Sequence, residues 1–408
     1  MAEPRSTQES QGAGAKPRLL VVPHVYAEDI RVREIELARG LGRYFDVYCL
    51  RWTDSNHGIS GGPLGRRWRQ ACRAAAAALA RTKDCIGKDG LGLIQLPVVQ
   101  PIILRRLVGD ALSLRVSRRC NGKRLEAAIR RLGISHVLVA TTIFGLPRLA
   151  GVRYFYDFVD WFPEEKASER EMRALRSQMR RLSAETDGVF VVSEPLAEKL
   201  RREYGLACTA LPNGTDLTEL RHVTDSEIES LRARWGSQGK YVIGYIGNHG
   251  DYSGVDFAER SFQLVRQQMP DAVLWIVGPA EYWRSRLQGR PGVIWTGQIP
   301  PSEIAPYFHA IDLGVLAQGK CAGTDFAFQI KVVEYTACRK FVISTPLETW
   351  RRLAWPNVRL VEPNPAEWAE AIVSARDAAW LPEWDTLVDE FDWSRLAELA
   401  ATIMLGRG

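Results

Sequence analysis

The chain of 408 residues lacks several features that mark particular protein classes. Its seven cysteines are scattered with no Cys-x-x-Cys spacing, which argues against a zinc site and favours a reducing cytoplasm. No apolar run approaches the ~18 residues of a membrane span. Residues 1–16 are small, polar and aperiodic and lack the apolar core of a secretory signal, so we expect a disordered leader there.

The chain does contain two blocks in which strand-like and helix-like segments alternate. Strand-like runs occur at 18–25, 136–140, 152–160 and 188–196, and again at 241–247, 272–278, 293–297, 313–317 and 341–345. This alternation predicts two parallel sheets with helices on both faces. We expect domains at 17–212 and 241–378, a linker at 213–240 and a helical tail at 379–408. Paired domains of this kind bind ligands between them, at the carboxyl ends of their strands.

The positive charge is concentrated in one region. The net charge is only +6, yet residues 65–135 hold 16 Lys/Arg against 4 Asp/Glu, a local excess of 12. A solvated Arg-rich face would explain this, and so would a surface that attracts anionic lipid head groups. Nucleic acid also fits the charge, but no recognised nucleic-acid motif accompanies it.

Three stretches at predicted strand ends carry candidate site residues. In GYIGNHGDYSGVDFA, Gly247 and Gly250 leave room for a ligand, and the following helix start suits phosphate, although the glycines do not match Gly-x-Gly-x-x-Gly. In YDFVDWFPEE, Asp157 and Asp160 are candidates for a general base, while Asp160 also fits a helix cap. PNGTD at 212–216 fits an Asn-Gly linker turn.

The stretch FAFQIKVVEYTACRK (326–340) predicts an apolar helix that keeps a cation and an anion. Lys331 and Glu334 are three residues apart and therefore share a helix face. Two interpretations fit this spacing, a plain salt bridge and a pair that faces a ligand.

Six stretches, taken in order, resemble the group 1, family-4-like glycosyltransferases. They are SEPLAEKL, LPNGTDL, YVIGYIG, LWIVGP, VIWTGQIPPSEIAPYFHAIDLGVLA and KVVEYTACRKFVIS. The resemblance runs from about Arg18 to the tail helix and is more specific in the second half. It implies the α/β GT-B fold, in which two Rossmann-like doubly wound domains face a central cleft and a C-terminal helix crosses back to the first domain. It also implies transfer of a sugar from a nucleoside-diphosphate sugar to an acceptor hydroxyl.

The resemblance implies roles for individual residues. Glu334 matches a glutamate that holds the ribose, and Lys331 matches a lysine that contacts the diphosphate in the branch that includes the xanthan glucuronosyltransferase. In that branch an Asp acts as the base of an inverting reaction; Asp160 matches it, with Asp157 in reserve. The further donor-side residues are Gly247, Asn248, His249, Gly250, Gly297, Gln298 and Ile299, and the acceptor-side residues are His24, Glu28 and Arg31.

The chain departs from the family pattern at two places. Many members carry a first glutamate seven residues before the second, where this chain has Phe326, with Asp325 one residue away on a different helix face. Many retaining members also have Arg and Lys in the loop that here reads NHGDYSG, where His249 replaces one of them only partly. We therefore expect backbone N–H groups and Lys331 to hold the phosphates.

The resemblance and the composition together suggest which metal or cofactor, which acceptor and which cellular location to expect. We expect no metal, because no Asp-x-Asp stretch occurs and GT-B enzymes generally work without one, and no cofactor beyond the sugar nucleotide as co-substrate. The expected acceptor is a glycan or lipid-linked saccharide in cell-envelope or exopolysaccharide synthesis, and the expected location is the cytoplasm, including the inner face of the membrane. The alternatives are a sugar-nucleotide epimerase, a non-catalytic nucleotide-sugar-binding subunit and a membrane-docked scaffold.

Overall fold

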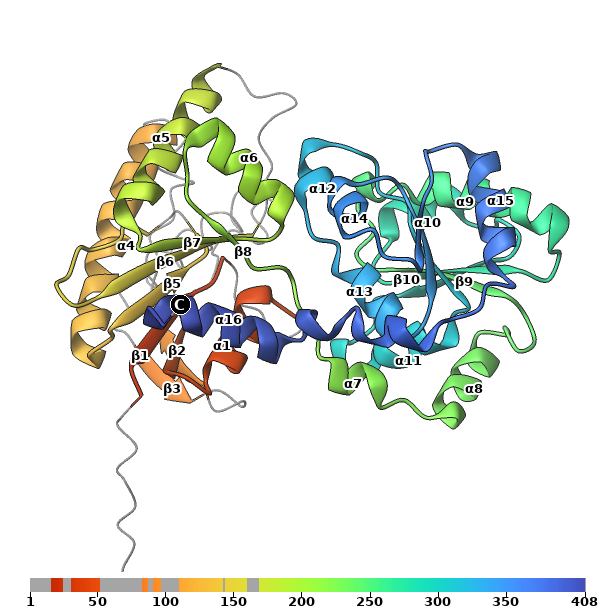
Figure 1. The fold of residues 1–408 in the computed structure, drawn as a ribbon, viewed down its shortest axis with the longest axis horizontal. Helices are drawn as coiled ribbons and strands as arrows, with labels where there is room; N and C mark the ends of the chain where they lie inside the picture. The colour runs from red at the N-terminus through yellow and green to blue at the C-terminus, as the bar shows by residue number, and fades with distance from the viewer. Residues whose placement is uncertain are drawn as a thin grey trace, which may run out of the picture.

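The structure is a computed structural model that describes residues 16–24, 31–51, 83–86, 91–96, 110–141, 144–159 and 169–407. These residues form two α/β domains, each built around its own sheet (Figure 1). Apart from Lys16, the expected leader lies outside the described residues.

The first domain contains an eight-stranded sheet in the order β3-β4-β2-β1-β5-β6-β7-β8. Within the described ranges every strand pair is parallel except β3 with β4. Central strands such as β1 and β5 are buried on both faces, as their continuous apolar sequences predict. The strands are β1 (Arg18–Val22), β2 (Asp46–Arg51), β3 (Lys83–Ile86), β4 (Gly92–Gln95), β5 (His136–Val139), β6 (Arg153–Phe158), β7 (Gly188–Val191) and β8 (Thr209–Ala210).

Helices cover both faces of this first sheet. α4 (Asp110–Leu132) and α5 (Glu169–Glu185) pack on one face, and α1 (Arg33–Leu41) packs on the other (Figure 1). α6 (Glu194–Tyr204) follows β7; Ser193 caps its start by accepting a hydrogen bond from the Leu196 N–H. α4 runs unbroken through Gly122. A Cβ at this position would stand 2.7 Å from the Gly145 carbonyl oxygen, so only glycine allows the close packing of the two segments.

The second domain contains six parallel strands in the order β11-β10-β9-β12-β13-β14. The strands are β9 (Val242–Ile246), β10 (Val273–Val277), β11 (Val293–Gly297), β12 (Leu313–Leu316), β13 (Phe341–Ser344) and β14 (Val358–Leu360). The helices are α7 (Leu217–Arg221), α8 (Asp225–Arg234), α9 (Val255–Gln268), α10 (Glu281–Leu287), α11 (Ala305–Ala310), α12 (Ala322–Phe326), α13 (Ile330–Ala337), α14 (Glu348–Leu353) and α15 (Pro365–Ala375), with 3-10 turns at Asp251–Ser253, Pro301–Glu303, Pro382–Thr386 and Asp389–Phe391.

Two segments connect the domains, and they lie against each other. Residues 211–216 lead from β8 to α7, and residues after Phe391 lead into α16 (Trp393–Leu405), which returns to pack on α1 (Figure 1). A parallel bridge between Thr215 and Asp392 joins the two crossings. α16 buries Leu396, Ala397, Ala400, Ala401 and Met404 in the core shared with α1. Burying one such Leu or Met contributes about 1.5–3 kcal/mol, so the tail stabilises the first domain.

This architecture confirms the two doubly wound domains and the returning C-terminal helix that the sequence predicts. No helix in the described part of the chain is long and apolar enough to cross a bilayer.

Candidate functional site

The glycine loop after β9 is held against the loop after β10. The Gly247 N–H donates to the Val277 carbonyl at 2.9 Å, and the His249 N–H donates to the Pro279 carbonyl at 3.0 Å. Gly278 has a φ of 119°, and a Cβ there would stand 1.9 Å from the Gly247 oxygen. Only glycine therefore allows the two loops to meet. The arrangement leaves Asn248 exposed and Gly247 partly exposed at the strand ends.

His249 in this loop is a buried neutral ring rather than a surface cation. It is 3% exposed, and burial lowers its pKa to about 4. Its Nε2 lies 3.1 Å from the Val277 carbonyl, which can only accept, so Nε2 carries the hydrogen and Nδ1 is bare. Nδ1 has no partner among the described residues. The expectation that His249 partly replaces a phosphate-binding cation is therefore wrong as regards charge; contact between His249 and the donor stays a prediction.

The Lys331–Glu334 pair lies at the start of α13. Lys331 Nζ donates to Glu334 Oε2 at 2.6 Å, and Glu334 Oε1 lies 3.5 Å from the Thr215 hydroxyl in the linker. The lysine side chain is 29% exposed and the glutamate 7%. The salt bridge considered from the sequence is thus present, and Lys331 remains reachable by an anion that competes with Glu334.

Tyr335 explains how α13 is fixed next to the glycine loop. Its hydroxyl donates to the Gly244 carbonyl at 3.1 Å and accepts from the Ile246 N–H at 2.8 Å. β12 pairs with β9 only as far as Gly244, so the Ile246 N–H finds its partner in this hydroxyl. The Lys-x-x-Glu-Tyr segment is therefore anchored directly to the strand that ends in Gly247.

The apolar stretch before Lys331 is not one helix, contrary to its sequence pattern. α12 ends at Phe326 and α13 begins at Ile330, with Gln329 between them donating to the Thr324 carbonyl and accepting from the Trp350 indole. The Phe326 carbonyl accepts from the Ser193 hydroxyl of the first domain at 2.6 Å.

Asp325, the carboxylate nearest to the missing first glutamate, is already engaged. One of its oxygens accepts from the Glu348 N–H at 2.9 Å and thus supports the start of α14. The structure therefore offers no sign that Asp325 substitutes for the missing glutamate.

The loop after β11 meets the first domain. Gly297, with a φ of 74°, accepts from the Gly278 N–H at 3.0 Å, and it is followed by an exposed Gln298 and a half-buried Ile299. Arg31 of the first domain donates to the Pro301 carbonyl and to the Glu219 carboxylate on α7. Arg31, expected on the acceptor side, thus forms a bridge between the domains.

Asp157 is buried in a structural ion pair. Its side chain has 0% exposure, and both oxygens accept from Arg33 at 2.9 and 3.1 Å. Arg33 also donates to the Leu211 and Pro212 carbonyls, at 2.6 Å each. Burial raises the pKa of Asp157, and Arg33 opposes this rise. In this arrangement Asp157 cannot reach an acceptor hydroxyl. This removes the basis for Asp157 as the alternative general base. Asp160 and Glu28 lie outside the described residues.

Sequence reasoning also missed the partners of His24. Its Nδ1 lies 2.5 Å from Glu34 Oε1, and its backbone N–H donates to the same oxygen at 3.1 Å. Glu34 is fully buried at the first turn of α1. Burial raises the pKa of Glu34, but hydrogen bonds and charge from His24 outweigh this and lower it overall. A charged pattern such as REIELARGL does not reveal which glutamate faces inward.

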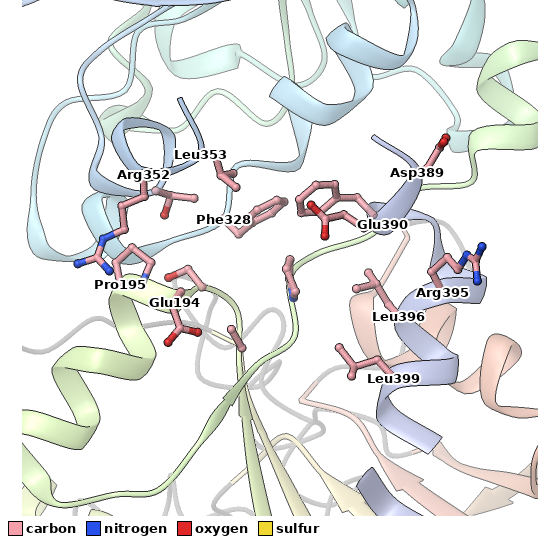
Figure 2. Close-up of a pocket in the computed structure, with 15 residues that line it drawn as sticks. Glu194, Pro195, Phe328, Arg352, Leu353, Asp389, Glu390, Arg395, Leu396 and Leu399 are labelled. Carbon is pink, nitrogen blue, oxygen red and sulfur yellow. The ribbon is translucent and has the colours of Figure 1, made fainter. Parts of the chain in front are cut away.

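A pocket of about 630 Å³ opens between the domains on the side of the tail helix (Figure 2). Phe328 projects into its middle, Leu396 and Leu399 of α16 face it from one side, and Pro195 of α6 lies on the other (Figure 2). Of the site residues predicted from the sequence, those within the described ranges do not line this pocket. Elsewhere, the described ranges bring together no group of three or more His, Cys, Asp or Glu that could hold a metal ion.

Comparisons with known proteins show that part of the chain is similar to a described family. Residues 240–377 match the family model described as group 1 glycosyl transferases. TuaH of Bacillus subtilis (strain 168), to which the role of a teichuronic acid biosynthesis glycosyltransferase is assigned, is 30% identical over 121 residues, or 29% of this chain and 30% of TuaH. The matched stretch thus spans less than a third of this relative.

Solved structures resemble nearly the whole chain. A glycosyltransferase from Rickettsia africae ESF-5 superposes with a TM-score of 0.66 at 13% identity, covering 96% of this chain and 100% of that one. HepE of Anabaena, in complex with UDP and glucose, gives 0.62 at 15% identity and covers 95% of each chain. At these identities the likeness concerns the fold, and it confirms the predicted GT-B architecture.

Proposed function

We propose that the protein is a glycosyltransferase that moves a sugar from a nucleoside-diphosphate sugar to an acceptor hydroxyl. One observation carries the proposal. The part of the chain that matches group 1 glycosyl transferases places the Lys331–Glu334 pair beside the glycine loop, through the bonds of Tyr335 to β9. A diphosphate needs a cation and close backbone donors, and a ribose diol needs an acceptor; this edge of the second domain supplies all three.

In this proposal the second domain binds the donor. Lys331 leaves Glu334 to contact the diphosphate, and Glu334 then accepts from the ribose hydroxyls. The Asn248 and Gly250 N–H groups complete the phosphate contacts, since those of Gly247 and His249 donate to the Val277 and Pro279 carbonyls. The loop at 297–299 contacts the base through its backbone. The charge of Lys331 takes the place that a metal would fill, so we propose metal-independent transfer. UDP is the nucleotide we favour, because HepE, which shares the fold, is solved with UDP and glucose.

The acceptor is proposed to enter through the first domain, and the resemblance of YDFVDWF to the xanthan branch makes Asp160 our proposed base of an inverting reaction. We further propose a lipid-linked saccharide of cell-envelope or exopolysaccharide synthesis as acceptor, in line with the role assigned to TuaH. α4 supports a location at the inner membrane surface, because it contains seven Lys/Arg against two Asp/Glu and exposes Arg119 and Lys123.

Two measurements test this function. Thermal shift with a panel of UDP- and GDP-sugars identifies the donor, since a ligand at 100 times its Kd adds about 2.7 kcal/mol. Release of UDP or GDP is then followed with and without lipid extracts that contain glycan acceptors. We expect release that depends on the acceptor. Conversion of the sugar nucleotide without an acceptor would identify an epimerase, and binding with no turnover under any condition would identify a non-catalytic subunit.

A further inference from the structure

The carbonyl oxygen of Gly250, the last residue of the glycine loop (247–250), accepts three hydrogen bonds. The indole Nε1–H of Trp283 on α10 donates to it at 2.7 Å. The Ser253 hydroxyl donates to it at 2.6 Å, and the Ser253 backbone N–H donates at 3.1 Å. The indole Nε1 also lies 3.1 Å from the Ser253 Oγ, so the two side chains act on the loop as one cluster.

Both side chains of this cluster are held in place by the rest of the second domain. Trp283 is 8% exposed and Ser253 is 1% exposed. The Trp283 backbone N–H donates to the Ala280 carbonyl at 3.0 Å, and the Tyr282 ring meets the indole edge-on. The Ser253 carbonyl accepts from the Tyr245 hydroxyl of β9. Because closely packed side chains with fixed partners change position little, the donors to the Gly250 carbonyl are fixed as well.

The glycine loop has two backbone N–H groups available to a ligand. Those of Asn248 and Gly250 donate to no backbone carbonyl among the described residues. The loop contains neither Arg nor Lys, so its hold on a phosphate depends on how well these donors are placed beforehand. Lys331 lies beside the same loop: burial lowers the pKa of His249 to about 4, and the charge of Lys331 adds to this effect.

We propose that Trp283 is a positioning residue for nucleoside-diphosphate binding, and this rests on the proposed function. Its indole N–H fixes the Gly250 carbonyl and thereby holds the Asn248 and Gly250 N–H groups in the arrangement that receives the diphosphate. A fixed backbone of this kind takes over part of the role that Arg and Lys of the loop have in many family members. Donors that are already ordered lose less entropy when the ligand binds, so the ligand binds more tightly. A Trp283 that only supported the fold would affect stability and leave nucleotide affinity unchanged.

The first experiment removes the indole N–H and keeps a buried aromatic ring. Trp283→Phe should bind UDP about 3- to 10-fold more weakly than wild type in calorimetric titration, which is the effect of one hydrogen bond. Trp275→Phe is the matched control, because the Trp275 indole is also buried and donates to the Ser237 hydroxyl oxygen at 3.0 Å, outside the loop. Both variants should lose stability in thermal unfolding, but Trp275→Phe should bind UDP as wild type does. Equal UDP affinity in all three proteins, or the same loss in both variants, would overturn the proposal.

A second pair of variants tests the same carbonyl without replacing a large ring. Ser253→Ala removes the hydroxyl donor to Gly250 and should also weaken UDP binding by about 3- to 10-fold. Ser237→Ala removes the acceptor of the Trp275 indole and should leave UDP affinity unchanged. Wild-type affinity in Ser253→Ala would contradict the proposal even if Trp283→Phe does not fold. If wild-type protein binds neither UDP nor GDP, the proposed function itself fails; if it binds and the loop variants bind equally well, only the positioning role fails.

Discussion

Replacing Arg33 by Met tests a buried, highly connected ion pair of the first domain. Arg33 donates to both oxygens of Asp157, to the Leu211 and Pro212 carbonyls, and to Asn213 Oδ1 at 3.2 Å. Its side chain is 5% exposed and that of Asp157 is fully buried. Met fills similar volume but donates nothing, so the variant leaves a buried carboxylate without its counter-ion.

Removing one partner of a buried pair costs about 3–5 kcal/mol, which for a domain of this size lowers Tm by roughly 10 °C. The loss should also depend on pH. Burial already raises the pKa of Asp157, and without Arg33 it rises further. A group whose folded pKa lies above its unfolded pKa stabilises below the unfolded value and loses this contribution as pH rises through the folded value. The difference between Arg33→Met and wild type should therefore be larger at pH 8 than at pH 5.

Urea unfolding followed by circular dichroism at both pH values measures this loss. Arg130→Met is the matched control, since Arg130 forms an exposed pair with Glu126 on α4 and its loss should cost under about 0.5 kcal/mol. The double variant Arg33→Met/Asp157→Leu should recover part of the stability, because it removes the orphaned charge. A loss below about 1 kcal/mol for Arg33→Met, or one that grows as pH falls, would refute the reasoning.

The remaining predictions concern the second domain and the surface of α4. Tyr335→Phe leaves the buried Ile246 N–H without its acceptor and should cost about 1–3 kcal/mol in urea unfolding; an unchanged midpoint would contradict this. Gly278→Ala should lower Tm and abolish UDP binding, because its Cβ would meet the Gly247 oxygen; near-normal binding would show that the loops can part. Arg119→Glu with Lys123→Glu should weaken co-sedimentation with anionic vesicles, more at low salt than at high salt, and retained binding would leave α4 as a solvated face.

The second domain could be predicted well from the sequence because its signals are local. Each strand is a short apolar run, glycine follows directly after β9 and β10, and the runs at 241–247 and 272–278 coincide with these two strands. The Lys331–Glu334 pair also follows from spacing alone, since residues three apart share a helix face.

Features that depend on distant partners could not be predicted. Arg33 and Asp157 are 124 positions apart, so nothing near either residue reveals that the pair is buried. The break before α13 is equally hidden in an apolar sequence, because it is set by the bonds of Gln329 to Thr324 and Trp350. The requirement for glycine at position 122 of α4 is hidden in the same way, because it comes from the close approach of Gly145, 23 positions away.

The central claim is that the edge formed by α13 and the glycine loop binds a nucleoside diphosphate through Lys331. Calorimetric titration of UDP and GDP into wild type, Lys331→Ala and the surface control Lys123→Ala tests it most directly. Losing one charge-assisted contact costs about 1.5–3 kcal/mol, so we predict that Lys331→Ala still folds but binds UDP on the order of 10- to 100-fold more weakly, while the control binds as wild type does. Equal affinity in wild type and Lys331→Ala would contradict the account and leave the lysine as only the partner of Glu334.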